Sequence, residues 1–249
     1  MQHQSATRLL ANRGVRMICL ILALSLLLPA SQAFGQQTYV GRFDVYAGYA
    51  YLNSPLISLA ENGVQAQFGV RVWPWMTLGF DFSDETGNTS ITPNLLTTTL
   101  QQQLGAELEG LIAEGAIPST YTLVVPIHSK TQTYAAGPQF SYHGLARATL
   151  FIRPAIGAMH ETATPHVNPS DQVATLIVQG LVPSGVKTDS VIFYGFGGGV
   201  DVNVTKHLAL RIQGDFVHDH LFSDLLKDSR NTVRFSVGPA FQFGKNVVK

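Results

Sequence analysis

The chain has 249 residues, of which 45% are hydrophobic and only 13% are charged, and its formal net charge is zero. A soluble domain is normally about one quarter charged, so this shortage favours a chain with a lipid-facing surface. The balanced charge argues against a nucleic-acid partner, which would require a basic surface. The single cysteine, Cys19, lies in the N-terminal segment described next, so the rest of the chain has no disulfide, thiolate metal site or cysteine nucleophile.

The first 33 residues predict a secretory signal peptide. Three arginines precede an apolar run at 17–28, and Ala33 ends a short stretch of small residues that suits signal peptidase. The run is too short to cross a bilayer as a helix. We therefore expect cleavage after Ala33 and a single mature domain, residues 34–249.

Eight segments of the mature chain alternate apolar and polar side chains with a period of two, as β-strands do. The segments are 43–52, 64–73, 77–84, 131–142, 148–158, 190–202, 207–217 and 232–243. About ten tilted residues cross the roughly 25 Å apolar core of an outer membrane, and each segment is close to that length.

The connections between these segments alternate in length. Short ones fall at 73–76, 143–147 and 203–206, and long ones fall at 53–63, 85–130, 159–189 and 218–231. Barrels of the bacterial outer membrane have short periplasmic turns and longer extracellular loops. The sequence therefore predicts an all-β fold, an eight-stranded antiparallel up-and-down transmembrane β-barrel with both ends of the mature chain in the periplasm.

The second long connection carries a helix signal. Thr92 can cap a helix, Pro93 suits its first position and Gly115 can end it. Leucines at spacings of four and three form an apolar stripe in this segment: Leu96, Leu100, Leu104, Leu108 and Leu111. We expect a short helix here. Its stripe is either an interaction surface for an apolar ligand or partner, or part of a lid in which it packs on the apolar run 173–178 of the third long connection.

The polar face of the strands is predicted to line the barrel, because a membrane barrel turns its apolar face to lipid. Eight charged side chains on that face form a candidate interior network: Asp44, Arg71, Asp81, Arg153, Asp201, Arg211, Asp215 and Arg234. Buried charges must be paired, and this set is balanced in sign. The network is either a salt-bridged plug or the lining of a narrow gated pore.

Strand phrases such as Phe-Asp-Val-Tyr-Ala-Gly-Tyr at 43–49 and Phe-Ser-Val-Gly-Pro-Ala-Phe at 235–241 carry a family resemblance. Over about residues 38–243 the chain resembles the small outer-membrane barrel family of the OmpA transmembrane domain and its opacity-protein and porin-like relatives. The resemblance implies the outer membrane of a Gram-negative envelope, with its lipid and lipopolysaccharide. It also implies periplasmic chaperones and the barrel-insertion machinery as partners during assembly.

The sequence offers little for a chemical centre. His218 and His220 flank Asp219, but this spacing is a weak metal signal. The chain has neither a Gly-x-Ser-x-Gly elbow nor a His-x-Ser motif on a strand. We expect no catalytic residue, cofactor or metal. The expected function is that of a non-enzymatic outer-membrane barrel, structural or binding ligands or partners through its long extracellular loops. The alternatives are a narrow porin-like channel with an Arg/Asp-lined interior and an envelope lipid-modifying enzyme.

Overall fold

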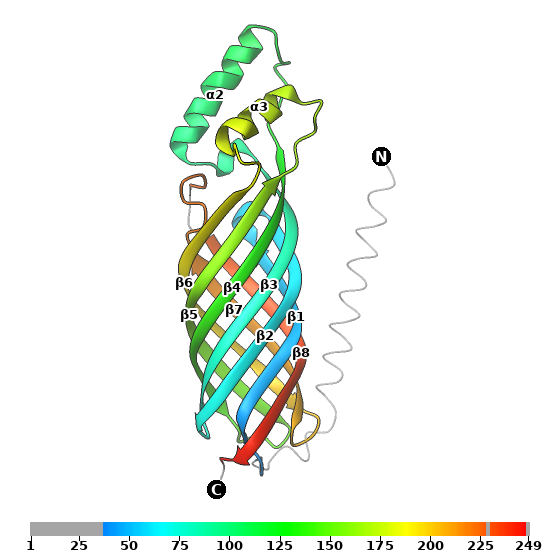
Figure 1. Ribbon diagram of the computed structural model, residues 1–249, viewed down its shortest axis with the longest axis vertical. Helices are drawn as coiled ribbons and strands as arrows, with labels where there is room; N and C mark the ends of the chain where they lie inside the picture. Colours follow the sequence, from blue (N-terminus) through cyan, green and yellow to red (C-terminus); the bar gives the residue numbers. More distant parts are fainter. Residues whose placement is uncertain (1–36, 228–229, 248–249) are drawn as a thin grey trace, which may run out of the picture.

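The computed structural model describes residues 37–227 and 230–247 and shows a closed β-barrel (Figure 1). Each strand runs antiparallel to its neighbours in the sequence, and β8 pairs with β1 to close the barrel. The strands are β1 (Gly41–Ser54), β2 (Leu59–Trp73), β3 (Met76–Ile91), β4 (Val125–Tyr142), β5 (Ala148–Pro165), β6 (Lys187–Asn203), β7 (Leu208–Asp219) and β8 (Arg230–Asn246). The predicted eight-stranded antiparallel barrel is confirmed. The predicted signal peptide, residues 1–33, lies outside the described residues.

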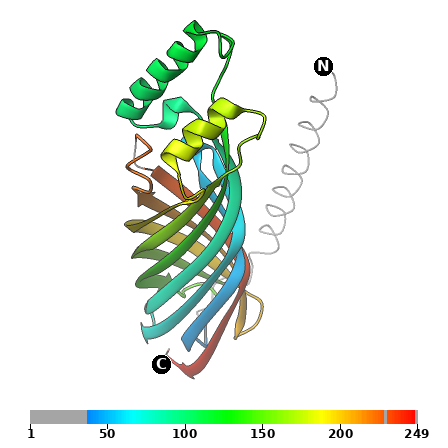
Figure 2. The ribbon, with the colours of Figure 1, turned by 45° about the horizontal axis from the view of Figure 1, so that its top comes forward.

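The two ends of the barrel differ. Tight turns join β2 to β3, β4 to β5 and β6 to β7 at one end, where β1 begins and β8 ends (Figure 1). At the other end stand two helices, α2 (Thr98–Ala113) between β3 and β4 and α3 (Gln172–Leu181) between β5 and β6 (Figure 2). Single 3-10 turns, η2 (Pro55–Ile57) and η3 (Pro93–Leu95), complete this end. The helix predicted in the second long connection is confirmed as α2, but its predicted start is wrong. Thr92 and Pro93 begin the separate turn η3, and α2 starts only at Thr98. Among the described residues, no helix is both long and apolar enough to span a membrane.

The outer wall of the barrel carries a belt of exposed apolar side chains. Ile192 is 78% exposed, Tyr194 66% and Ile156 64%, whereas Arg153 and Asp201 of the same strands are buried inside. A soluble barrel has the opposite arrangement, with apolar side chains within. The wall is therefore built to face lipid.

The belt ends towards the helices at one row of paired residues, where polar side chains take over the outer wall. This row runs through the polar residues Asp84, Gln132, His160 and Ser190 across β3 to β6. The strands continue beyond it with polar residues on both faces. The barrel therefore extends past the lipid-facing belt. We call this extension, the parts of the strands between the row and the helices, the collar.

The strands are longer than the sequence pattern predicted, and the predicted long connection at 53–63 is wrong. Asn53 pairs with Ala60 and Ser54 with Leu59, so only η2 and Ser58 separate β1 from β2. Ser58 adopts a left-handed φ of 51°, which lets the chain reverse within this short turn. The other three long connections shorten to 92–124, 166–186 and 220–229 because their flanks pair within the collar.

Two prolines in the strands share one interruption of the hydrogen-bonded ladders. The β4–β5 pairing runs to Ala136–Ile156 and resumes at Phe140–Ile152, and the skipped residues include Pro138 and Pro154. Neither proline can donate a backbone hydrogen bond, so placing them opposite each other confines the loss to one point of one ladder.

Candidate functional site: the barrel interior and its cap

The lower layer of the interior, nearest the tight turns, consists of Asp44, Arg71, Asp201 and Arg211, which are at most 3% exposed. Nε of Arg211 lies 2.7 Å from Oδ1 of Asp201, and its Nη2 lies 3.0 Å from Oδ1 of Asp44. Nη1 of Arg71 donates instead to the carbonyl oxygen of Gly41 at 2.6 Å. Two carboxylates and two guanidiniums balance this layer.

The middle layer consists of Asp81, Arg153, Asp215 and Arg234. Nη2 of Arg234 lies 2.9 Å from Oδ1 of Asp81 and 2.9 Å from Oδ2 of Asp215. Arg153 bridges the same two aspartates at 3.3 and 3.1 Å. Both guanidiniums therefore contact both carboxylates, and the four side chains form a closed set of alternating charges.

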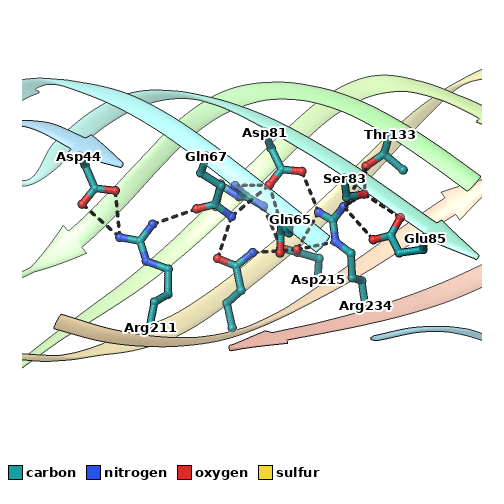
Figure 3. A network of polar contacts seen from close by, with 12 residues as sticks. Asp44, Gln65, Gln67, Asp81, Ser83, Glu85, Thr133, Arg211, Asp215 and Arg234 are labelled. Atoms are coloured by element: carbon teal, nitrogen blue, oxygen red, sulfur yellow. Dashed lines mark hydrogen bonds and ion pairs between the residues drawn. The ribbon is translucent and has the colours of Figure 1, made fainter. Parts of the chain in front are cut away.

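Glutamines join the lower layer to the middle layer (Figure 3). Gln67 accepts from Nη1 of Arg211 at 2.8 Å and donates to Asp81 at 3.0 Å and to Gln213 at 2.9 Å. Gln213 donates in turn to Asp215 at 3.0 Å. A cavity beside this layer measures only about 10 Å³, room for no more than about one water molecule. The eight predicted interior residues thus lie together inside the barrel, in two adjoining layers.

An upper layer lies towards the helices and was not predicted. It holds four carboxylates, Glu61, Glu85, Glu161 and Asp219, but a single guanidinium, Arg230, and all five are at most 3% exposed. The balance of charge inferred from the sequence therefore does not extend to the whole described interior, because three carboxylates are in excess. The sequence pattern predicted that all five residues lie in long connections, but they lie on strands of the collar.

Arg230 organises only part of the upper layer. Its Nη2 lies 2.5 Å from Oε2 of Glu161 and its Nε lies 3.1 Å from Oδ1 of Asp219. Ser129 donates to the other oxygen of Glu161 at 3.0 Å. Among the described residues, neither carboxylate oxygen of Glu61 has a hydrogen-bond partner.

The three connections above the collar pack together as a cap over the barrel mouth, which we define as residues 92–124, 166–186 and 220–227. Backbone hydrogen bonds join Thr97 to Leu225 (2.8 Å) and Lys227 to Leu95 (3.1 Å). The backbone N–H of Phe222 donates to Oδ2 of Asp189 at 2.6 Å. The cap is therefore a single structure built from loops that are distant in sequence.

The predicted leucine stripe faces into this cap. Leu96 and Leu104 are buried, and Leu100 and Leu108 pack against them in a cluster that includes Ile177 of α3. Leu111 is partly buried. The stripe thus packs on the third connection, which is the lid arrangement foreseen as one of its two roles.

Between the cap and the collar lies a cavity of about 100 Å³. Its walls come from β3 to β5, α2, α3 and the connection after β7, with Leu104, Ile177 and Phe222 among its apolar side chains. Glu161 and Arg230 of the upper layer form its charged floor, and Lys187 also lines it. We call this space the cap cavity.

Comparisons with known proteins bear on the fold. No family model and no curated protein sequence matches the chain. Among solved structures, the barrel is similar to neisserial surface protein A (NspA), with 11% identity, a TM-score of 0.50, and coverage of 82% of this chain and 99% of that one. The outer-membrane protein OprG from Pseudomonas aeruginosa gives 9% identity, a TM-score of 0.50, and coverage of 84% and 99%. The chain has the fold of the small outer-membrane barrels. The resemblance inferred from the strand phrases is thereby confirmed at the level of fold.

One titratable group of this outer-membrane-type barrel lies in a tight turn, outside the strands. Burial, with the positive charge of Arg71 nearby, lowers the pKa of His143 to about 4. Its Nδ1 lies 3.2 Å from Oγ1 of Thr149.

We expect His143 to make the barrel acid-sensitive. Unfolding returns its pKa to about 6.5, so the unfolded chain binds a proton below that pH that the folded barrel excludes. The free energy of unfolding should therefore fall as the pH drops from about 6.5 to 4, by up to about 3 kcal/mol. His143→Gln should remove this part of the pH dependence in urea unfolding followed from pH 7.5 to 4. If the free energy of unfolding depended on pH equally in both proteins, His143 would not be the cause of the acid sensitivity.

The phenol of Tyr121 ties two of the cap connections together. Its hydroxyl donates to the carboxylate of Asp171 at 3.0 Å, and the same carboxylate caps α3 by accepting from Ala174 N–H at 2.9 Å. Burial and this carboxylate raise the pKa of Tyr121 to about 12, so the phenol stays protonated and remains a donor.

Tyr121→Phe should loosen the cap without unfolding the barrel. The loss of one hydrogen bond to a charged acceptor corresponds to about 1.5–3 kcal/mol of local stability. We expect faster amide hydrogen exchange in α2 and α3 and unchanged exchange in the strands. Tyr194→Phe, on the exposed belt, is the matched control, and equal exchange in both variants would show that the tie is not important.

The remaining candidate chemistry is sparse. The rings of His218 and His220 lie 5.0 Å apart, and no group of three potential metal ligands exists among residues 37–227 and 230–247. On the outer wall, Nδ1 of His160 lies 2.7 Å from Oγ of Ser190, at the row where the belt ends. No adjacent sequence motif marks this pair, because its members lie on different strands.

Proposed function

We propose that the protein is a non-enzymatic outer-membrane barrel that binds a ligand through its extracellular cap and does not conduct ions. The observation that carries the proposal is the contrast between a filled interior and a hollow cap. The apolar belt and the collar support an outer-membrane location, with the tight turns and both chain ends in the periplasm.

The filled interior supports a plug rather than a pore. A conducting barrel needs a continuous aqueous path, but the middle layer joins Arg153 and Arg234 to both aspartates across the lumen. An eight-stranded barrel has an interior only wide enough for side chains. A gate would require these buried pairs to separate, at a cost of several kcal/mol per desolvated ion.

Planar-bilayer recording tests the non-conducting part of this proposal. Purified protein should give no discrete conductance above that of protein-free bilayers, and Arg211→Met should leave this unchanged. Single-channel openings in the natural protein that change with Arg211→Met would replace the plug by a gated pore.

Removal of the cap tests the proposal that the protein binds ligands through it. In a variant with 92–124 and 167–185 replaced by short Gly-Ser linkers, the barrel should still show heat-modifiable migration. The intact barrel should bind members of a small-fragment library in ligand-observed NMR, and the variant should lose that binding. Equal binding by both proteins would remove the cap from the proposal.

The hydrogen bond between His160 and Ser190 favours one other candidate, a lipid-modifying enzyme. A serine beside an imidazole is the start of a nucleophilic site. However, no hydrogen bond joins this imidazole to a carboxylate within residues 37–227 and 230–247, so nothing orients it as in a triad. Lipid mass spectra of cells with the natural protein and with Ser190→Ala should be identical. A lipid species that depends on Ser190 would establish the enzyme instead.

A further inference from the structure

The cap cavity has a strongly apolar wall. Leu104 of α2, Ile177 of α3 and Phe222 of the last connection contribute to it, and all three are less than 10% exposed. A cavity with apolar walls can hold an apolar ring, since an engineered one of about 150 Å³ binds benzene. The volume of about 100 Å³ therefore suits a molecule of about one six-membered ring.

One polar atom of the cavity floor has no partner. Arg230 uses Nη2 for Glu161 and Nε for Asp219, but its Nη1 is buried and donates no hydrogen bond within the described chain. A buried donor without an acceptor is costly, and most are satisfied by protein, water or ligand. Because Arg230 lines the cap cavity, an acceptor on a ligand is placed to complete it.

The surrounding charge selects the kind of acceptor. Arg230 is already matched against two carboxylates, those of Glu161 and Asp219, so this group holds more negative than positive charge. An anionic ligand would be repelled by this excess and would also have to leave its water behind. A cationic ligand would face the guanidinium itself. An uncharged acceptor, such as a carbonyl oxygen, avoids both costs.

We propose that the cap cavity binds a small uncharged molecule, mainly apolar and about the size of one ring, whose single acceptor oxygen bonds Nη1 of Arg230. This inference rests on the proposed function, because it names the ligand class of the cap.

Three fluorinated probes of one size test the ligand class by 19F NMR with the full-length barrel in lipid nanodiscs. 4-Fluoroacetophenone carries a carbonyl, 1-ethyl-4-fluorobenzene carries no acceptor, and 4-fluorobenzoate carries a negative charge. We expect the ketone to bind about tenfold more tightly than the hydrocarbon, as one hydrogen bond to a charged donor allows. We expect the benzoate to bind more weakly than both. Benzoate binding as tight as that of the ketone would overturn the proposal.

Neighbouring residues of α3 supply a matched pair of variants that locate the site. Ile177→Phe fills the cavity, whereas Leu176→Phe adds the same bulk at a position 67% exposed to solvent. Ile177→Phe should abolish binding of the ketone and the hydrocarbon, and Leu176→Phe should leave both unchanged. If Ile177→Phe does not weaken binding, the cavity is not the site, even where removal of the cap still abolishes binding and the proposed function stands.

Arg230→Lys tests the donor while keeping a charge beside Glu161 and Asp219. It should lower ketone affinity to the level of the hydrocarbon and leave hydrocarbon affinity unchanged. That selective loss separates a lost hydrogen bond from a disturbed fold, which would weaken both ligands, and heat-modifiable migration checks the fold directly. Unchanged ketone affinity in this variant would remove Arg230 from the site.

Discussion

Arg234→Met is expected to lower the free energy of unfolding by about 3–5 kcal/mol, the cost typical of breaking a buried ion pair from one side. Arg234 contacts Asp81 and Asp215 at 2.9 Å and also donates to Ser83 at 2.7 Å and Thr133 at 2.8 Å. Its loss leaves two buried carboxylates with Arg153 alone. Methionine preserves much of the volume, so the effect reports charge and hydrogen bonding rather than a cavity. Urea unfolding in detergent, read by gel migration and tryptophan fluorescence, measures the change.

Two companion variants identify the cause of that loss. Arg42→Met, at an exposed position on β1, should change stability by less than about 0.5 kcal/mol. Adding Asp215→Asn to Arg234→Met should restore part of the loss, because it removes one of the carboxylates left without its partner. If the double variant is as unstable as the sum of the two single variants, the two side chains act independently and the network model fails.

The alternating sequence pattern was sufficient to predict the belt and the residues of the lower and middle layers. Within the membrane the two faces of each strand contrast sharply, so residues such as Asp81 and Arg153 stand out at inward positions between apolar neighbours. A period of two fixes their side of the wall, and the barrel then brings them together. The closed fold converts eight separate sequence positions into one network.

The collar and the cap could not be read in the same way. Above the belt both faces of a strand can be polar, so the alternation that marks a strand disappears in segments such as 85–91 and 159–165. Glu85 and Glu161 therefore looked like loop residues, although their side chains are buried. The cap cavity depends on contacts among three connections separated by many residues, and no local pattern encodes such contacts.

Glu61→Gln, in contrast to Arg234→Met, is expected to stabilise the barrel by about 1–3 kcal/mol. Glu61 is 0% exposed and neither oxygen of its carboxylate has a hydrogen-bond partner among the described residues. Its charged neighbours include Glu85 and Glu161, so ionisation is opposed both by desolvation and by like charge. Glutamine retains the shape and removes the charge. The same urea unfolding measurement gives the sign of the change in the free energy of unfolding. It is made at pH 8, where the cost of the charge is greatest.

Glu161→Gln is the control that makes this sign informative, because the chemical change and the layer are the same. Glu161 is bonded to Arg230 at 2.5 Å and accepts from Ser129 at 3.0 Å, so its neutralisation should destabilise the barrel by about 2 kcal/mol or more. Opposite signs from one substitution type at two buried glutamates would show that pairing, rather than burial or packing, determines the stability of the upper layer. A loss of stability at both positions would mean that Glu61 interacts favourably with its surroundings, and Glu61 could then no longer be treated as an unpaired buried carboxylate.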